Sequence, residues 1–225
     1  MLRTFIFGLA YIFLSVSGLY AQNTVMLVAD RVLIDGKGIL RAEGSVEVTQ
    51  GTAKLKSQLL IYNKLLDRYQ LKGPIYLDEG AGYIAISSQA DLSADLQTGI
   101  LQSVRLIYDD RTQVAAAQMR RVEGGQNQYY KTVASSCRTC NKSDVPLWKI
   151  RARNVVQDHE KQRIFFRNAT LYVADVPILY TLRLSIPEPG VKRAAGFLRP
   201  ELRFTNNLGV GLKIPYFTPL GDHAD

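Results

Sequence analysis

The chain has 225 residues, of which 47% are hydrophobic and 21% are charged, a balance that indicates a folded globular protein and excludes a largely disordered one. Its formal net charge of +8 suits an anionic partner such as a nucleic acid, a membrane surface or a phosphorylated glycolipid, and does not choose among them.

The first residues predict export. Arg3 precedes an apolar run over residues 5–16, and Ala21 offers a small residue at a cleavage position. These are the parts of a secretory signal peptide, and the apolar run is shorter than the about 20 residues of a membrane-spanning helix. We therefore expect residues 1–21 to be a signal peptide, which argues against nucleic-acid binding in the cytosol.

From Val25 to about Tyr108, short runs alternate apolar and polar residues, and turn residues separate the runs. Alternation with a period of two predicts β-strands, whereas helical spacing of apolar residues is not sustained anywhere in this region. The clearest runs are Val32–Ile34, Gly44–Val48, Leu59–Tyr62 and Ile75–Leu77. The sequence therefore predicts an all-β fold.

A loose repeat of about 30 residues runs through the same region. Each unit has a strand, a polar turn and a second strand, as in residues 29–46, 59–75 and 90–106. A lone hairpin cannot bury its apolar face, so we expect the hairpins to stack and share one core. A β-sandwich with regular hairpins is the simpler alternative.

The rest of the chain falls into three parts. The stretch Asp109–Ser143 is more polar and contains both cysteines, and strand-like alternation then resumes over residues 146–173. Pro187–Gly190 predicts a boundary because proline and glycine end strands. Residues 198–216 predict two strands with a turn between them, a pattern that suits the first hairpin of a transmembrane barrel and also a soluble amphipathic hairpin.

Several separated segments together resemble one known family. They are Tyr130–Cys137, Pro146–Ala152, Ala169–Val173, Val176–Tyr180, Ala195–Pro200, Ile214–Phe217 and Gly221–Asp225. In this order they resemble the LptD family of outer-membrane lipopolysaccharide-assembly proteins. Upstream, Ala42–Val46 resembles the OstA-type domain that this family shares with the periplasmic proteins LptA and LptC. The resemblance covers nearly the whole mature chain and implies a periplasmic β-jellyroll followed by the first hairpin of an outer-membrane β-barrel.

On this resemblance, residues 22–186 form the OstA-like jellyroll, and residues 187–225 form a linker and the first barrel strands. The jellyroll is expected to receive lipopolysaccharide acyl chains from the periplasmic Lpt bridge and to pass them toward the barrel at the outer membrane. An LptA-like protein is expected to add a strand near Val25–Leu33, and an LptE-like lipoprotein is a partner if a barrel is present. The alternatives are a stand-alone LptA-like periplasmic lipid-binding bridge, and a structural periplasmic scaffold that binds no lipid.

The resemblance places the lipid groove on inward-facing apolar side chains of the strands. The candidates are Val32, Ile34, Val46, Val48, Leu59, Ile61, Ile75, Leu77, Ile84 and Ile86. Such residues also form an ordinary core in a protein that carries no lipid.

Cys137 and Cys140 form a C-x-x-C pair. A redox site requires the pair at a helix start, and a zinc site requires further ligands, for which only His159 and His223 are present. Export favours structural disulfides. The resemblance implies a partner for Cys137 late in the barrel, outside this chain, or else a pairing that involves Cys140.

No nucleophile stands beside a base in a supporting frame, so we expect no enzyme, no cofactor and no metal. Pro200 and Pro215 each remove one interstrand hydrogen bond from the terminal hairpin, because proline has no backbone N–H. The resemblance implies that these prolines weaken the seam of a barrel and so form a lateral gate for lipid. Prolines that are merely tolerated on edge strands are the alternative.

Overall fold

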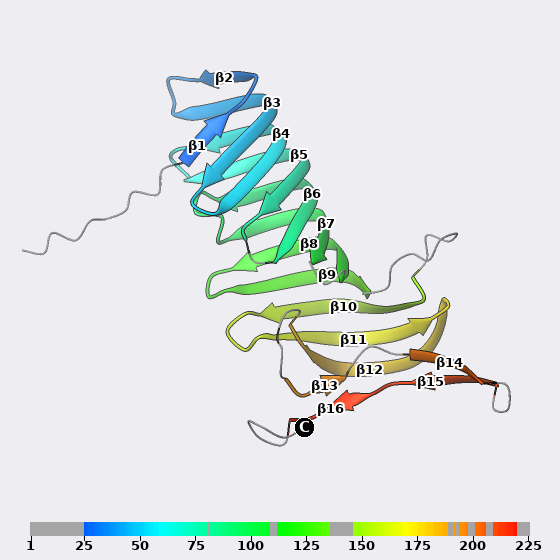
Figure 1. Cartoon of the computed structure of the whole chain (residues 1–225). Helices are drawn as coiled ribbons and strands as arrows, with labels where there is room; N and C mark the ends of the chain where they lie inside the picture. The colour runs from blue at the N-terminus through cyan, green and yellow to red at the C-terminus, as the bar shows by residue number, and fades with distance from the viewer. Residues whose placement is uncertain are drawn as a thin grey trace, which may run out of the picture.

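The computed structural model describes residues 25–80, 82–108, 112–135, 146–188, 191, 194–197, 201–205 and 209–219. Every regular element in these ranges is a β-strand, and most of the strands follow one another in a single twisted sheet (Figure 1). The predicted all-β fold is confirmed.

The strands of the main sheet pair with their neighbours in sequence, all antiparallel. The first of them are β1 (Val25–Val28), β2 (Arg31–Ile34), β3 (Ile39–Gln50), β4 (Ala53–Asn63), β5 (Arg68–Asp78), β6 (Tyr83–Ser93) and β7 (Gly99–Tyr108). The others are β8 (Gln113–Val122), β9 (Gln126–Ser135), β10 (Trp148–Asp158), β11 (Arg163–Val173) and β12 (Val176–Pro187). The short strands β1 and β2 both pair with β3 at one end of the sheet, and β12 is the strand at the other end.

The polar stretch after Asp109 does not interrupt the sheet, because β8 and β9 continue it as far as Ser135. These two strands place Val114, Ala116, Met119 and Tyr129 on the buried face and put glutamines and arginines between them. A strand that is apolar on only one of its faces has a polar average composition. This explains why the sequence does not clearly indicate strands at β8 and β9.

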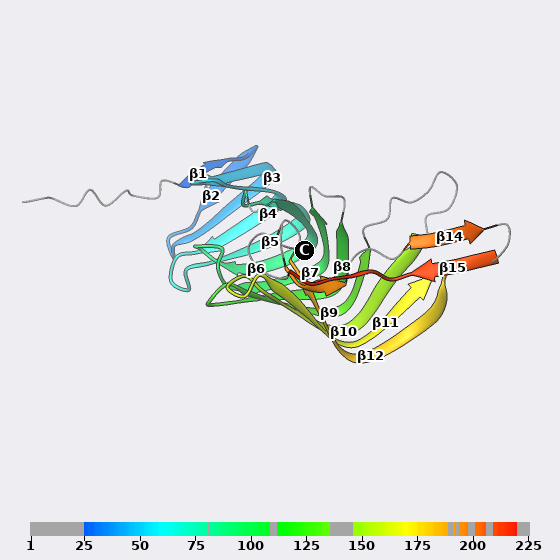
Figure 2. The ribbon, with the colours of Figure 1, turned by 60° about the horizontal axis from the view of Figure 1, so that its bottom comes forward.

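A line of β-bulges crosses the sheet near the middle of its strands. The register shifts between Glu43 and Val46, between Lys56 and Leu59, and between Lys72 and Ile75. Further along the sheet, positive φ angles mark the same line at Ser103, Lys131 and Asn168. A bulge adds an unpaired residue and bends its strand. Because the bulges are aligned, the whole sheet bends along one line and curls over itself (Figure 2).

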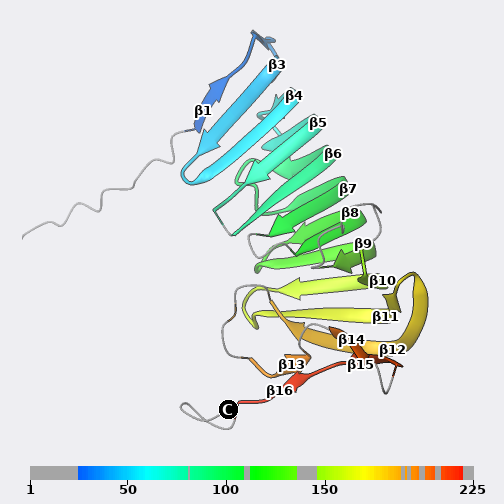
Figure 3. The same cartoon turned by 45° about the vertical axis from the view of Figure 1, so that its right-hand side comes forward.

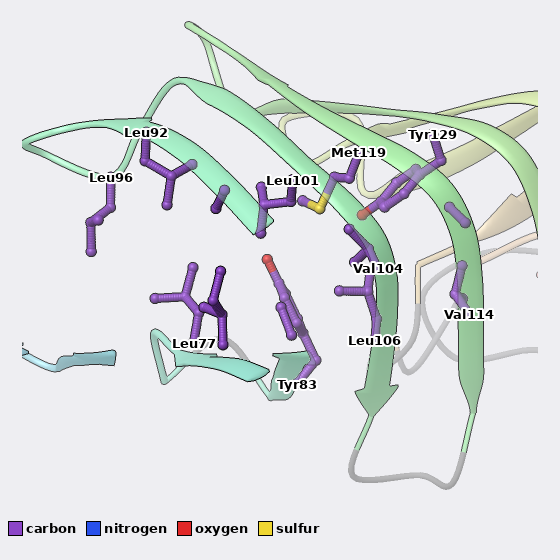
Figure 4. Close-up of a cluster of buried hydrophobic side chains, with 14 of the residues drawn as sticks. Leu77, Tyr83, Leu92, Leu96, Leu101, Val104, Leu106, Val114, Met119 and Tyr129 are labelled. Carbon is purple, nitrogen blue, oxygen red and sulfur yellow. The ribbon is translucent and has the colours of Figure 1, made fainter. Parts of the chain in front are cut away.

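Two rows of side chains, one on each side of this bend, line the inner face. The first inner row contains Ala42, Leu60, Leu71, Ala90, Leu101, Met119, Tyr129, Val155 and Phe166, which are cross-strand partners and are all buried. The second inner row contains Val48, Leu55, Leu77, Ala85, Leu106, Val114, Ala134, Ile150, Leu171 and Leu179. Figure 4 shows Leu77 and Tyr83 pointing across the interior toward Leu92 and Leu101, so the two halves of the curled sheet pack on each other.

The last described strands form a hairpin in two pieces below β12 (Figure 3). In it, β13 (Gly196–Phe197) pairs with β16 (Tyr216–Phe217), and β14 (Glu201–Thr205) pairs with β15 (Gly209–Lys213). Pro215 lies between β15 and β16, where the ladder is interrupted, and Pro200 lies outside the described residues. The part of the chain that the structure describes contains no helix that is long and apolar enough to cross a membrane.

Candidate functional site

Four of the predicted groove residues lie inside the curled sheet. Val46 and Val48 on β3 are buried, as are Ile75 and Leu77 on β5. Val48 and Leu77 belong to the second inner row, and Val46 and Ile75 lie at the bend. Whether any of them contacts lipid stays a prediction.

For Leu59 and Ile61 on β4 the predicted inward direction is wrong. Their cross-strand partners on β5 are Lys72 and Gln70, and the side chain that is buried is the one between them, Leu60. The register of β4 with both neighbours shifts between Lys56 and Leu59, and beyond this point the buried positions change from Leu55 and Ser57 to Leu60. A count by twos from buried Leu55 therefore gives the wrong face after the bend.

The predicted inward direction is also wrong for Ile84 and Ile86 on β6. Tyr83 and Ala85 take the inner face of this strand, and Ile84 is exposed. Two isoleucines in alternation resemble a core pattern, but the bulk of a side chain does not decide its direction.

Val32 and Ile34 on β2 are exposed, Ile34 at 72%, so their predicted place in the interior is wrong as well. Since β2 is a short strand at the end of the sheet, the described residues include no second half to cover it. This strand instead presents apolar side chains at the end of the sheet.

Sequence reasoning missed most of the interior. The buried residues that were not predicted include Leu55, Leu60, Leu71, Leu92, Leu101, Leu106, Met119 and Tyr129. Leu101 and Leu106 lie in a run with apolar residues on both faces, and the bulge at Ser103 separates them. The positions of the bulges were the missing signal.

The burial of the second inner row decreases along the sheet from β7 to β12. Leu106 on β7 is fully buried, and the residues that continue the row on β10 and β11, Ile150 and Leu171, are only partly buried. Leu179 on β12 is 53% exposed. One apolar row therefore begins inside a closed core and ends on an open face.

Polar side chains join the two edges of the sheet where it curls over. Antiparallel pairing puts the end of β5 and the end of β7 at one edge, and the ends of β8 and β10 at the other. Glu79, directly after β5, nevertheless contacts Arg121 of β8 with 2.9 Å between carboxylate and guanidinium. The two side chains are 16% and 11% exposed. This contact across the fold is an ion pair that is largely shielded from water.

A hydrogen-bonded chain makes a second connection between the two edges. The hydroxyl groups of Tyr108 and Tyr129 both approach Oε1 of Gln157, at 3.5 and 2.5 Å. Nε2 of Gln157 donates to Glu188, which also accepts a contact of 2.8 Å from Nδ1 of His159. We call this whole set the polar clasp. Its members are Glu79, Tyr83, Tyr108, Arg121, Asn127, Tyr129, Gln157, His159 and Glu188.

The electrostatics of the polar clasp follow from its burial. Burial raises the pKa of Tyr129 well above its usual value, and neighbouring tyrosines add to the rise. Burial also raises the pKa of Tyr83, against the effect of Arg121. For Glu188, burial works against ionisation, but hydrogen bonds from His159 and Gln157 outweigh it and lower the pKa. The buried tyrosines are therefore neutral donors to Gln157, and the amide group of Gln157 in turn donates to the ionised carboxylate of Glu188.

His159 joins this network through both nitrogens of its ring. Its Nδ1 faces Glu188, and its Nε2 lies 3.1 Å from the amide nitrogen of Asn127. A ring protonated on Nδ1 donates to the carboxylate and accepts from the amide, so both contacts are satisfied. The ring is thus held in place by two partners, and no nucleophile lies among its hydrogen-bond partners.

The sequence is similar to those of several curated LPS-assembly proteins. LPS-assembly protein LptD of Aromatoleum aromaticum is 26% identical over 197 residues, which cover 83% of this chain and 24% of that protein. LptD of Acinetobacter baumannii is 26% identical over 204 residues, which cover 91% of this chain and 24% of that protein. LptD of Thiobacillus denitrificans is also 26% identical, over 91% of this chain and 27% of that protein. The chain is similar to LPS-assembly protein LptD.

The similarity to LptD extends over most of this chain, but the chain spans only about a quarter of the length of these curated relatives. No family model matches the sequence. Among solved structures, LptH of Pseudomonas aeruginosa, described as the LptA homologous periplasmic component of a lipopolysaccharide transport device, is 16% identical. It covers 55% of this chain and 91% of its own, with a TM-score of 0.39.

The remaining predicted sites lie in parts that the structure does not describe. Cys137 and Cys140 fall in the gap between Ser135 and Pro146, and residues 1–21 and His223 are also outside the described residues. Within the described ranges, no group of three or more histidine, cysteine, aspartate or glutamate side chains could hold a metal ion.

Proposed function

We propose that this chain acts in lipopolysaccharide transport and assembly at the outer membrane, as part of an LptD-type protein. The apolar inner face of the curled sheet takes the acyl chains, and the polar head of the lipid stays outside. The similarity to LptD supports the substrate, and the inner face supplies the chemistry that the acyl chains require.

The observation that carries the proposal is the change along the second inner row. A fully packed interior has no free volume for an acyl chain. At β10 to β12 the same row is uncovered, with Ile150 and Leu171 partly buried and Leu179 exposed. Acyl chains therefore bind first on the open inner face of β10 to β12.

The domain division follows from this proposal. Residues 1–21 are a signal peptide, residues 22–186 are the jellyroll in the periplasm, and residues 187–225 are a linker and the first strands of an outer-membrane barrel. The antiparallel pairing of β13 with β16 and of β14 with β15 supports the last assignment, because neighbouring strands of such a barrel pair in this way. Pro200 and Pro215 are proposed to weaken this hairpin and so to contribute to a lateral gate.

The partners are proposed on the same basis. An LptA-like bridge protein adds a strand at the end of the sheet, where β1 and β2 present Val25–Leu33. An LptE-like lipoprotein joins through a barrel, and Cys137 and Cys140 form structural disulfides. The chain is a transport component and has no catalytic role.

Site-specific photo-crosslinking tests the proposal with a matched pair of positions on β12. Leu179 belongs to the inner row, whereas Tyr180 points to the outer face, where its hydroxyl group contacts Asn168. Both side chains are similarly exposed, at 53% and 59%. With a photo-reactive amino acid at each position in a lipopolysaccharide-producing bacterium, we expect a lipopolysaccharide adduct from position 179 and a much weaker one from position 180.

The adduct is detected as a shifted band that reacts with an antibody against lipopolysaccharide. Equal adducts from positions 179 and 180 would mean that exposure, and not the inner face, determines contact. Absence of an adduct at both positions, with the protein present in the envelope, would overturn the transport proposal and leave the scaffold.

A further inference from the structure

The outer face of the sheet has a hollow where β9, β10 and β11 bend. It has a volume of about 470 Å³ and is lined by Tyr130, Lys131, Arg151, Arg153, Asn168 and Thr170, among others. Lys131 and Asn168 have positive φ angles of 50° and 51°, and Arg153 has no partner in either ladder of β10. The hollow is thus a product of the bulges, which separate neighbouring strands where their residues are unpaired.

The charge of this hollow is positive and is not neutralised within the described residues. No described carboxylate lies within 4.0 Å of Lys131, Arg151 or Arg153. Beside it, Arg167 of β11 stands directly opposite Arg183 of β12. Like charges that face each other across strands destabilise a sheet. An arrangement of this kind is explained if an anion binds there and offsets the repulsion.

Two of the cations are positioned by aromatic rings. The guanidinium of Arg151 lies over the ring of Tyr172, 5.0 Å from its centre, and the amino group of Lys131 lies 5.5 Å from the centre of the Tyr130 ring. Such contacts restrict the cations without neutralising them. Asn168 and Thr170 add neutral donors at the same wall.

The donor set indicates the class of ligand. Arginine presents several N–H groups in a planar fork that matches the oxygens of a phosphate, and lysine adds a point charge. Some cations elsewhere on the outer face are paired with acids, as Arg68 is with Asp91 and Lys56 is with Glu47, and others, such as Arg105 and Arg120, form no ion pair with a described carboxylate. What distinguishes the hollow is that three such cations, Lys131, Arg151 and Arg153, line one concave site.

We propose that this hollow is a binding site for a phosphate group, supplied either by a lipid headgroup or by free phosphate. The site goes beyond the proposed function and does not depend on it, because it lies on the face of the sheet opposite to the apolar inner rows. Its loss would leave the inner face intact, and closure of the inner face would leave the hollow intact.

The test compares two variants of equal charge. Arg151→Gln/Arg153→Gln removes two cations from the hollow, and Arg105→Gln/Arg120→Gln removes two exposed cations of β7 and β8 that do not line it. Two probes are used with the whole chain: sedimentation with vesicles of phosphatidylglycerol and phosphatidylcholine, and phosphorus NMR of inorganic phosphate. We expect the hollow variant to bind about tenfold more weakly, the scale of one lost charge-assisted hydrogen bond, and the control variant to bind nearly as the parent does.

The two probes distinguish the sources of the phosphate. Vesicle binding that is lost only in the hollow variant assigns a lipid headgroup, and line broadening of inorganic phosphate without vesicle binding assigns free phosphate. An equal loss of binding in both variants would mean that the net charge of the chain, and not the hollow, determines binding, and would overturn the proposal. The proposal is also overturned if the parent chain binds neither probe. If the double variant fails to fold, Lys131→Gln, which removes one cation from the hollow, is compared with Arg120→Gln, which removes one exposed cation that does not line it.

Discussion

The two ends of the second inner row differ in what lies opposite them. Around β7, the other half of the curled sheet covers Leu106, whereas around β12 nothing among the described residues covers Leu179 to the same degree. Both are leucines in the same row and in the same kind of strand. The alternation of a strand therefore determines which face is apolar, and the curl of the sheet determines whether that face is buried.

The polar clasp lies where the closed region ends. Its ion pair joins β8 to the segment after β5, and its hydrogen bonds join β7 and β9 to β10 and to Glu188 after β12. Neutral tyrosines and an ionised carboxylate replace apolar contacts at this point. Hydrogen bonds thus close this region of the sheet, and the second inner row is less buried beyond it.

The largest expected effect comes from truncating the row at its closed end. Leu106→Ala should lower the free energy of unfolding by about 3 kcal/mol, because it leaves a cavity in a packed interior. Leu179→Ala should lower it by less than about 1 kcal/mol, because its side chain is largely exposed in the native chain. Urea unfolding followed by circular dichroism measures both values.

Equal costs at the two positions would contradict the comparison. In that case Leu179 is covered by residues outside the described ranges, and the open face is not available to lipid. Leu182→Ala, at a more exposed position of the same strand, serves as a control for general effects on β12.

A smaller effect is expected at the ion pair of the polar clasp. Glu79→Gln leaves the guanidinium of Arg121 largely buried without its partner and should cost about 2 kcal/mol. Glu47→Gln removes the partner of Lys56 from an exposed pair and should cost less than about 0.5 kcal/mol. Urea unfolding of the two variants checks the difference.

A second substitution sharpens this test. Adding Arg121→Leu to Glu79→Gln removes the unpaired charge and should recover part of the lost stability, as found for buried ion pairs that are replaced by apolar groups. If the double variant is less stable than Glu79→Gln by the full cost of Arg121→Leu alone, the two side chains act independently and the ion pair does not join the edges.

The sequence predicts the strands better than it predicts their faces. Period-two alternation identified the all-β fold and the hairpins of β4 with β5 and of β6 with β7. It assigned Leu59, Ile61, Ile84 and Ile86 to the wrong face. Nothing in the sequence of β4 marks the register shift, and in β6 the inner face carries the small Ala85 while the larger isoleucines lie on the outer face. After a register shift, the face to which a side chain points depends on how the strands pair and not on the alternation within one strand.

The polar clasp could not be predicted from the sequence for a different reason. Glu79 and Arg121 are 42 residues apart, and Tyr108 and Gln157 are 49 residues apart. Each lies near the end of a strand, where a polar residue is ordinary and indicates only a turn or a solvated edge. Their meeting depends on the angle through which the aligned bulges bend the sheet, and no single segment contains that information.

The smallest expected effect concerns the dependence of stability on pH. The pKa of Glu188 is lowered in the folded chain relative to the ordinary value of 4.5, so its ionised form stabilises the fold. This contribution is fully present above the ordinary value and is lost as the pH falls through the lowered pKa. The parent chain should therefore lose unfolding free energy more steeply below pH 4.5 than Glu188→Gln does, when urea unfolding is measured as a function of pH.

Glu123→Gln, which changes an exposed carboxylate on the turn after β8, should leave that steepness unchanged. Parallel pH profiles for the parent chain and Glu188→Gln would mean that His159 and Gln157 do not hold the carboxylate ionised. The clasp would then end at Tyr129 and Gln157, without a connection to the segment after β12. A steeper profile in the parent chain extends the closed region to Glu188, which directly follows β12, whereas the exposed inner-row residue Leu179 lies near the beginning of that strand.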